Sequence, residues 1–376
     1  MPLEEWFDEF QFQAYNLGES SVSVFSLNEI KEICGLDFTH IHSLPLRYGN
    51  HVGAYSLREV IARDYPGLRP ENILVTTGAA EALFLIYTAL LNPGDHIVVQ
   101  HPNYPSHWSI PRALGCRITF LRADFDSNYA IDLERVDSFV SEGLKILAIC
   151  NPNNPTGYIF NIEQLKALIK KAEKHNFILL VDEVYRDLTF NGQLPTAASL
   201  SPNAISIGSV SKAYGLPGLR IGWIATQNQE ILKSALAIKE HITICNSSLT
   251  EAIATQILEK KHLLINRVKG HILQNYSLLK TWLLLHNDVL EYVEPKAGVV
   301  CLPRFKTEIT IDFYRALAHD YNVFVIPGSC FEMSDKYFRV GFGGKREELE
   351  KGLELFDVAI NKEVLYGNRK NRRNKA

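Results

Sequence analysis

The sequence predicts an α/β protein in which a mostly parallel sheet forms a large domain and a smaller α+β domain follows it. Three short runs are mostly apolar, as strands are when helices cover both faces of a parallel sheet: residues 146–150, 177–181 and 204–208. A helical pattern over residues 162–175 separates the first two, the alternation expected of parallel strands joined by helices. At 376 residues the chain is also longer than a single core normally grows.

The change in character after Val289, from alternating strands and helices to shorter mixed elements, sets the expected domain division. An amphipathic helix over residues 258–286 is expected to bridge the two domains. We expect an N-terminal arm that joins the small domain, the large domain, the C-terminal small domain and a disordered basic tail: residues 1–45, 46–285, 286–362 and 363–376.

The composition is that of an ordinary globular protein, with 46% hydrophobic residues, 22% charged residues and a net charge of -3. This balance predicts no nucleic acid partner, and no apolar run approaches the ~20 residues of a membrane span. The six cysteines show no CxxC spacing, so we expect no metal site and no disulfide framework. The acidic start does not resemble a signal peptide, and a cytoplasmic location is expected.

The first 64 residues contain short helical patterns separated by turns. Helices are expected over residues 5–13, 27–34 and 54–64. Gly18 lies in a small polar run between the first two, which suits a loop whose backbone closely approaches a ligand.

The next two strands both end at candidate ligand contacts. The strand expected at residues 73–77 runs into Gly78, Ala79 and Ala80 at the start of a helix, where free N–H groups favour an anion. Close packing of strand against helix would explain the same small residues. The strand at 96–99 leads to Tyr104, held between prolines, which would stack on an aromatic cofactor or pack in the core.

Two further strands deliver polar residues to the same expected edge of the sheet. The strand at 146–150 precedes a rigid turn that contains Asn154. The strand at 177–181 ends in Asp182, a carboxylate behind four apolar residues that needs a cationic partner. A protonated pyridine nitrogen would be such a partner. Tyr185 follows three residues later.

A lysine loop, residues 209–220, is the segment around which the site is expected to form. Lys212 stands between hydroxyl residues and a Gly/Pro-rich turn, and a lysine amine attacks an aldehyde only when it is neutral. Ser209, Ser211 and Arg220 are suited to binding phosphate. An aldehyde that carries a phosphate describes pyridoxal phosphate (PLP), although such a loop taken alone is more often a solvated turn.

The remaining elements complete the large domain and form the small one. A strand is expected at 221–225 and a helix over 231–256. The small domain is expected to contain strands near 292 and at 299–302, 323–326 and 337–342, and a closing helix over 346–361. Arg339 lies inside an apolar strand, so it requires a carboxylate from the protein or from a substrate.

From about residue 40 to 360, these motifs in this order resemble the fold-type-I PLP enzymes of the class I/II aminotransferase superfamily. The resemblance implies a mostly parallel sheet of the seven-stranded type. It implies that Lys212 binds the cofactor aldehyde and acts as the general acid/base, while Asp182 pairs with the ring nitrogen. Tyr185 and Asn154 would bind the phenolic oxygen, and Tyr104 would stack on the ring.

The same resemblance assigns the phosphate and the substrate carboxylate. The backbone of Gly78, Ala79 and Ala80 would hold the phosphate together with Ser209, Ser211 and Arg220. Tyr48 matches a position that reaches the phosphate of the neighbouring subunit, so a homodimer is implied. Arg339 would bind the substrate carboxylate, with Asn154 and Gly18 also at the substrate.

The N-terminal segment departs from the usual family pattern, which has a Gly-rich stretch ending in Pro-Asp where this chain has residues 16–22. Residues 2–6, the lysine loop and residues 325–328 look most like hydroxyarginine cyclases of the superfamily. That resemblance implies loss of a side-chain hydroxyl as water and closure of the guanidine onto the chain. Glu19 and Asp187 are the candidates to hold the guanidinium.

Two other functions share parts of this pattern. A plain aminotransferase would use every cofactor residue named above and differ only after proton removal. A ligand-sensing regulator on the same fold would need an added DNA-binding domain, for which residues 1–40 leave no room.

Overall fold

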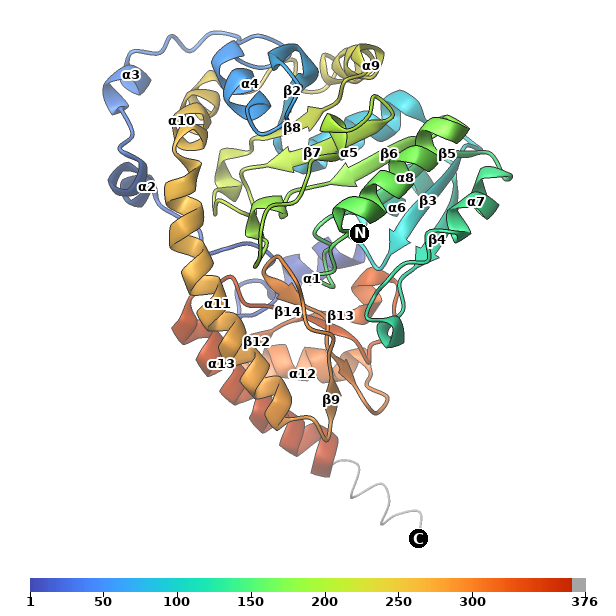
Figure 1. Cartoon of the computed structure of the whole chain (residues 1–376). Coiled ribbons are helices and arrows are strands. Elements are labelled where there is room, and N and C mark those ends of the chain that lie inside the picture. Colours follow the sequence, from blue (N-terminus) through green and yellow to red (C-terminus); the bar gives the residue numbers. More distant parts are fainter. Residues whose placement is uncertain (367–376) are drawn as a thin grey trace.

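The computed structural model describes residues 1–366, and its large domain is built around a seven-stranded sheet (Figure 1). The strand order is β2, β8, β7, β6, β5, β3, β4. All neighbouring pairs are parallel except the two that involve β8. The strands are β2 (Ile73–Thr76), β3 (His96–His101), β4 (Arg117–Arg122), β5 (Leu144–Cys150), β6 (Ile178–Asp182), β7 (Ala204–Ser209) and β8 (Gly222–Ala225). The predicted α/β class with a mostly parallel sheet is confirmed.

Helices cover both faces of this sheet, which explains why its central strands are apolar throughout. In β5, Ile146 and Ala148 belong to one apolar core and Leu147 and Ile149 to another. The first core includes residues of α5 (Gly78–Leu90), α6 (Ser106–Ala113) and α9 (Gln229–Lys239), and the second includes residues of α7 (Arg135–Val140) and α8 (Ile162–His175). With water excluded from both faces, the polar residues of β5, β6 and β7 gather at their carboxyl ends.

Most helices begin and end near the predicted residues, but one prediction is wrong. A single helix was expected over 231–256, and the chain instead forms α9 and α10 (Ser248–Glu259), with residues 240–247 between them. Ile244 has a φ of 62°, a left-handed conformation that interrupts a helix, and Ser247 is the N-cap of α10. Helices α6, α7 and α12 (Ile311–Tyr321) and strand β4 were also not predicted from the sequence.

The 25-residue helix α11 (Lys261–Leu285) runs from the large domain to the small one and forms the predicted bridge (Figure 1). The small domain contains a three-stranded sheet, in which β14 (Phe338–Gly341) lies between β10 (Val300–Cys301) and β13 (Ile326–Pro327). Strands β9 (Leu290–Glu291) and β11 (Arg304–Phe305) form a separate pair. Helices α12 and α13 (Arg346–Ala359) pack against each other and complete the domain.

The N-terminal segment is bonded to the small domain and then to the lysine loop. In α1 (Pro2–Phe10), Trp6 donates its ring N–H to the Val325 carbonyl at 2.9 Å. Strand β1 (Tyr15–Asn16) pairs in parallel with β12 (Val323–Phe324), and Gly341 N–H donates to the Leu17 carbonyl at 2.7 Å. The predicted domain boundaries, with residues 1–45 as an arm that joins the small domain, stay a prediction. Helices α2 (Leu27–Cys34), α3 (Phe38–His42) and α4 (Tyr55–Ala62) follow.

The end of the closing helix extends into the segment predicted as a tail. Residues 360–366 continue from α13 as wider helical turns, so 363–366 are helical rather than part of a tail. The rest of the predicted basic tail lies outside the described residues. Within residues 1–366, none of the helices has the length and apolar character needed to cross a membrane.

Gly341 provides a test of how tightly the N-terminal segment is seated. A methyl group at Gly341 would lie 2.0 Å from the carbonyl oxygen of Glu19, so the segment must shift. We expect Gly341→Ala to lower the free energy of unfolding by roughly 1–3 kcal/mol, measured by urea denaturation. Gly344→Ala is the matched control, because a methyl group there meets nothing within 4 Å in residues 1–366. Equal stability of the two variants would show that the segment is loosely held.

Candidate active site

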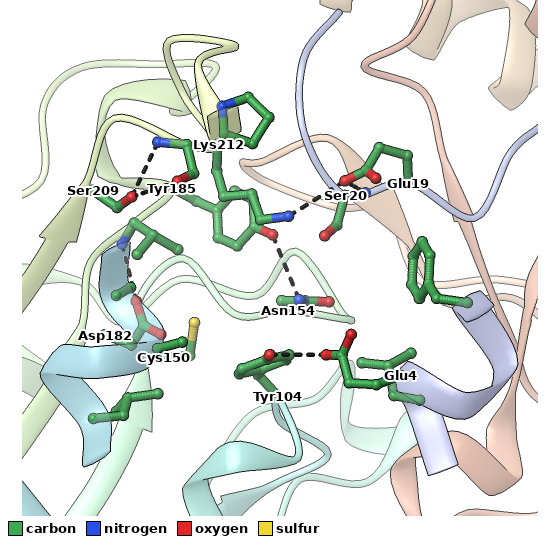
Figure 2. A pocket seen from close by; sticks show the side chains of 18 of the residues that line it. Glu4, Glu19, Ser20, Tyr104, Cys150, Asn154, Asp182, Tyr185, Ser209 and Lys212 are labelled. Atoms are coloured by element: carbon green, nitrogen blue, oxygen red, sulfur yellow. Dashed lines mark hydrogen bonds and ion pairs between the residues drawn. The ribbon is translucent and has the colours of Figure 1, made fainter. Parts of the chain in front are cut away.

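A cavity of about 550 Å³ lies where the carboxyl ends of the parallel strands meet the small domain and α1 (Figure 2). Its lining comes from eight parts of the chain: α1, residues 19–20, the start of α5, the segments at the ends of β3, β5 and β6, the lysine loop, and β14. The predicted site residues that line it are Glu19, Ala79, Ala80, Tyr104, Asn154, Asp182, Tyr185, Ser209, Ser211, Lys212, Arg220 and Arg339. Most of the predicted constellation is therefore brought together.

The lysine loop is shaped by hydrogen bonds between its own residues. Ser209 Oγ accepts from the Ser211 N–H at 3.0 Å and lies 2.8 Å from Ser211 Oγ. Arg220 has a φ of 53°, which reverses the chain before β8. Lys212 extends into the cavity, and its Nζ lies 3.3 Å from Oε1 of Glu19 (Figure 2).

Asp182 ends β6 as a buried carboxylate. Its Oδ1 accepts from the Val184 N–H at 3.1 Å, and its Oδ2 lies 3.6 Å from Nε2 of His107. The other ring nitrogen of His107 lies 2.9 Å from the hydroxyl of Tyr87. All three side chains are buried, so the Val184 N–H fixes one carboxylate oxygen while the ring of His107 lies beside the other.

Arg339 is buried and connects the small domain to the site. It donates through Nη1 to Oδ1 of Asn154 at 3.0 Å and through Nη2 to the Gly18 carbonyl at 2.6 Å. Asn154 in turn lies 3.5 Å from the hydroxyl of Tyr185. Burial lowers the pKa of Arg339 from its ordinary value. Its Nε is buried and has no hydrogen-bond partner in the described part of the chain.

The start of α5 and the end of the lysine loop form a close-packed cradle. A methyl group at Gly222 would lie 2.5 Å from the carbonyl carbon of Gly78 and 2.7 Å from the amide nitrogen of Ala79. A methyl group at Gly78 would lie 2.6 Å from Nη2 of Arg220. The first N–H groups of a 13-residue helix therefore lie beside a guanidinium, which is a favourable setting for phosphate.

Tyr104 borders the cavity opposite the lysine loop and contacts α1 (Figure 2). Its hydroxyl donates to Oε1 of Glu4 at 3.0 Å. Burial, together with the negative charge of Glu4, raises the pKa of Tyr104 to about 12, so this hydroxyl stays protonated at neutral pH.

Comparison with known proteins identifies the family. Residues 28–356 match the sequence pattern of the family aminotransferase class I and II. The chain belongs to this family. It is 30% identical over 373 residues to capreomycidine synthase of Streptomyces vinaceus, covering 96% of this chain and 93% of that protein.

Two solved structures resemble this aminotransferase-family chain along nearly its whole length. A PLP-dependent aminotransferase from Streptococcus suis superposes with a TM-score of 0.91 at 27% identity, covering 96% of this chain and 97% of the other. A PLP-dependent cyclase, OrfR, superposes with a TM-score of 0.90 at the same identity and the same coverage. The predicted family and the predicted cofactor, PLP, are both confirmed.

The residues at the site fit this cofactor. The cavity brings together an amine, a buried carboxylate and a helix N-terminus beside an arginine, which match the aldehyde, the ring nitrogen and the phosphate of PLP. We propose that Lys212, Asp182 and the cradle of Gly78, Ala79 and Arg220 hold it. When bound, PLP withdraws electrons from the α-carbon of the substrate and makes its proton removable.

Asp187 is not part of this cavity, and its prediction as a guanidinium ligand is wrong. Its carboxylate accepts from the Tyr214 hydroxyl and lies 3.6 Å from Nζ of Lys261 and 3.7 Å from Nε of Arg186. Burial would raise the pKa of Asp187, but Arg186 and Lys261 outweigh it and hold that pKa below its usual value. Asp187 thus contacts Tyr214 of the lysine loop and Lys261 of α11, and it joins these two segments.

Gly18 and Tyr48 take different positions from the lining residues. Gly18 lies behind the cavity and contributes its carbonyl to Arg339. Tyr48 does not line the cavity and is 79% exposed, so its predicted role toward a neighbouring subunit stays a prediction.

Several lining residues were missed by the sequence analysis: Glu4, Asp8, Ser20 and Cys150. Cys150 is the last residue of a predicted strand, so its position could have been found from the strand alone. Glu4 and Asp8 belong to α1, and no local pattern places that helix against a cavity whose lining extends to Arg339.

Gly222 tests the proposed phosphate cradle. We expect Gly222→Ala to displace the start of α5 and to weaken PLP binding by about tenfold or more, since overpacking of this kind usually costs about 1–3 kcal/mol. Absorbance titration of the cofactor-free protein measures the dissociation constant. Gly218→Ala in the same loop is the control, because its methyl group meets nothing within 4 Å among residues 1–366. Unchanged PLP affinity in Gly222→Ala would contradict the proposed cradle.

Glu183, next to Asp182, predicts a pH dependence of stability. Burial, only partly offset by Arg186, raises its pKa from 4.5 to about 7. The folded state therefore binds this proton more tightly than the unfolded state, so stability falls as pH rises from about 5 through 7. The full effect is roughly 3 kcal/mol at 1.36 kcal/mol per pKa unit.

We expect Glu183→Gln to flatten this fall, measured by urea denaturation between about pH 5 and 8. Glutamine can still accept from the Ala197 N–H and the Ser206 hydroxyl through its Oε1. The control is Glu350→Gln, because the side chain of Glu350 on α13 is exposed. This variant should keep the wild-type slope. If Glu183→Gln keeps that slope as well, Glu183 does not titrate as stated.

Proposed function

We propose that the chain is a PLP-dependent cyclase that acts on a hydroxylated L-arginine. It removes the α-proton, expels the side-chain hydroxyl as water and closes the guanidine onto the chain to form a cyclic guanidino amino acid. The observation that carries this proposal is an acidic wall of the cavity: Glu4, Asp8 and Glu19. The similarity to capreomycidine synthase, which covers 96% of the chain, supports it.

The cavity offers opposite charges to the two ends of an arginine. Arg339 and Asn154 both line the cavity, and we propose that they bind the α-carboxylate. The acidic wall is contributed by the N-terminal segment, and a guanidinium donates to carboxylates in pairs of strong hydrogen bonds. An amino acid with a cationic side chain therefore matches this cavity better than one with an acidic side chain.

Lys212 is the residue proposed to move protons. Its amine removes the α-proton and returns a proton to the same carbon after the ring has closed. A β-hydroxyl leaves with a proton as water, whereas a γ-hydroxyl first requires removal of a second proton, from the β-carbon. One guanidine nitrogen then bonds to the carbon that carried the hydroxyl and gives up a proton. In the γ route a proton also returns to the β-carbon, so in both routes the product is the substrate less one water. Tethering of the guanidine favours this closure.

The second candidate function is amino transfer between an amino acid and a 2-oxo acid. The family match and the similarity to the Streptococcus suis aminotransferase favour it, because the cofactor residues proposed here serve both reactions. The two functions differ in where the amino group goes. An aminotransferase passes it to a 2-oxo acid, and a cyclase retains it.

We also propose a homodimer in which Tyr48 reaches the site of the second copy. The segment before α4 exposes large apolar side chains, with Leu46 86% exposed and Tyr48 79% exposed. Exposed apolar residues gathered in one segment are typical of a protein interface.

The decisive experiment incubates the protein and PLP with β- and γ-hydroxyarginine in the absence of any 2-oxo acid. We expect a product lighter by one water that keeps its α-amino group, identified by mass spectrometry with ¹⁵N-labelled substrate. Lys212→Ala, the control, should give no product because the base is missing. Unchanged hydroxyarginines, together with amino transfer when a 2-oxo acid is added, would instead establish the second candidate.

A further inference from the structure

Tyr214 connects the lysine loop to the protein behind it. Its side chain is buried and does not line the cavity, and its hydroxyl donates to Oδ2 of Asp187. Within residues 1–366, only two side chains between residues 211 and 219 form hydrogen bonds to other segments, those of Lys212 and Tyr214. Lys212 extends into the cavity, and Tyr214, which follows it closely in the loop, is bonded to the turn after β6.

Asp187 is held in place by charges on two sides. Its carboxylate lies 3.7 Å from Nε of Arg186 and 3.6 Å from Nζ of Lys261, the first residue of α11. Lys261 is in turn paired with Asp64, which lies 3.8 Å from Nη2 of Arg186. A buried carboxylate that is paired on both sides is costly to move, because any displacement would leave charges uncompensated. Asp187 is therefore a firm acceptor for the hydroxyl of Tyr214.

The bond between Tyr214 and Asp187 lies where backbone pairing no longer joins the two segments. Strands β6 and β7 pair in parallel as far as Asp182 and Ile207. Beyond that point, in residues 1–366, this bond is the one hydrogen bond that connects the turn after β6 with the lysine loop. The first segment begins at Asp182 and the second carries Lys212. The bond therefore constrains how far the amine lies from the carboxylate.

We propose that Asp187 is a positioning residue that acts through Tyr214 to hold Lys212 at the aldehyde of PLP while Asp182 pairs with the ring nitrogen. Asp187 does not itself line the cavity, so it would affect the cofactor only through the lysine loop. The proposal rests on the placement of PLP given above. It applies equally to a cyclase and to an aminotransferase, because both need the same cofactor contacts.

The test uses the full-length protein loaded with PLP and the variant Tyr214→Phe. This change removes the hydroxyl and keeps the ring that fills the buried space. We expect PLP to be released about tenfold faster after dilution, the size of effect expected when one hydrogen bond to a charged group is lost. The visible circular dichroism band of the bound PLP should also weaken, because the cofactor is no longer held in a single orientation.

Tyr276→Phe is the matched control. Tyr276 is also buried, and its hydroxyl donates at 3.1 Å to Oε1 of Glu294, a carboxylate that is paired with Lys280 of α11. Because Tyr276 does not line the cavity and is not bonded to the lysine loop, this variant should keep the wild-type release rate and band. Urea denaturation should show a similar loss of stability in both variants, since each loses one buried bond of the same kind.

A second variant, Asp187→Asn, tests the acceptor. Asparagine can still accept from the hydroxyl of Tyr214 but carries no charge, so its release rate should lie between those of wild type and Tyr214→Phe. A wild-type rate and band in Tyr214→Phe, or equal changes in Tyr276→Phe, would overturn the proposal. If Tyr214→Phe does not fold, Asp187→Asn decides, and a wild-type rate and band in that variant would overturn it as well.

Discussion

The structure depends on the backbone hydrogen bonds that residues 15–25 make in two directions. On one side, Leu17 bonds to Phe324 and Gly341 of the small domain. On the other, Val22 and Phe25 bond to the lysine loop of the large domain. Because one short segment satisfies both sets of partners, the small domain, the lysine and the acidic wall hold fixed positions relative to one another.

The cavity also shows how buried charges are made tolerable in this chain. Asp182, Arg339 and Asp187 are all removed from water to a large degree, which is costly for an isolated ion. Each is met by protein donors or by ions of opposite sign, although within residues 1–366 Nε of Arg339 has no hydrogen-bond partner.

The sequence predicted best those features that depend on neighbours in the chain. Buried strands such as β5 and β6 are apolar throughout, and the polar residues that follow them necessarily collect at one edge of the sheet. Edge strand β4 was missed because its short apolar run, residues 118–121, is only partly buried and lies between two exposed arginines. The split between α9 and α10 depends on one left-handed residue, Ile244, which a helical pattern does not reveal.

Long-range packing explains the errors at the site itself. Glu4 reaches the cavity only because α1 docks on the small domain, and Asp187 leaves it only because Tyr214, Arg186 and Lys261 claim its charge. Tyr214 and Lys261 lie far from Asp187 in the sequence, as Val325 does from α1. The position of a carboxylate near a strand end is therefore a weak indication that it contacts the substrate.

The contact between Glu19 and Lys212 has a further consequence for how substrate and base communicate. Glu19 has a single carboxylate, and a guanidinium that enters the acidic wall competes with the ammonium for it. Arrival of a cationic side chain would then release the amine from its counter-ion at the moment when proton removal is required. An amino acid with a neutral side chain would not displace the amine of Lys212 from Glu19. Removal of its α-proton would therefore be slower than for an amino acid with a cationic side chain.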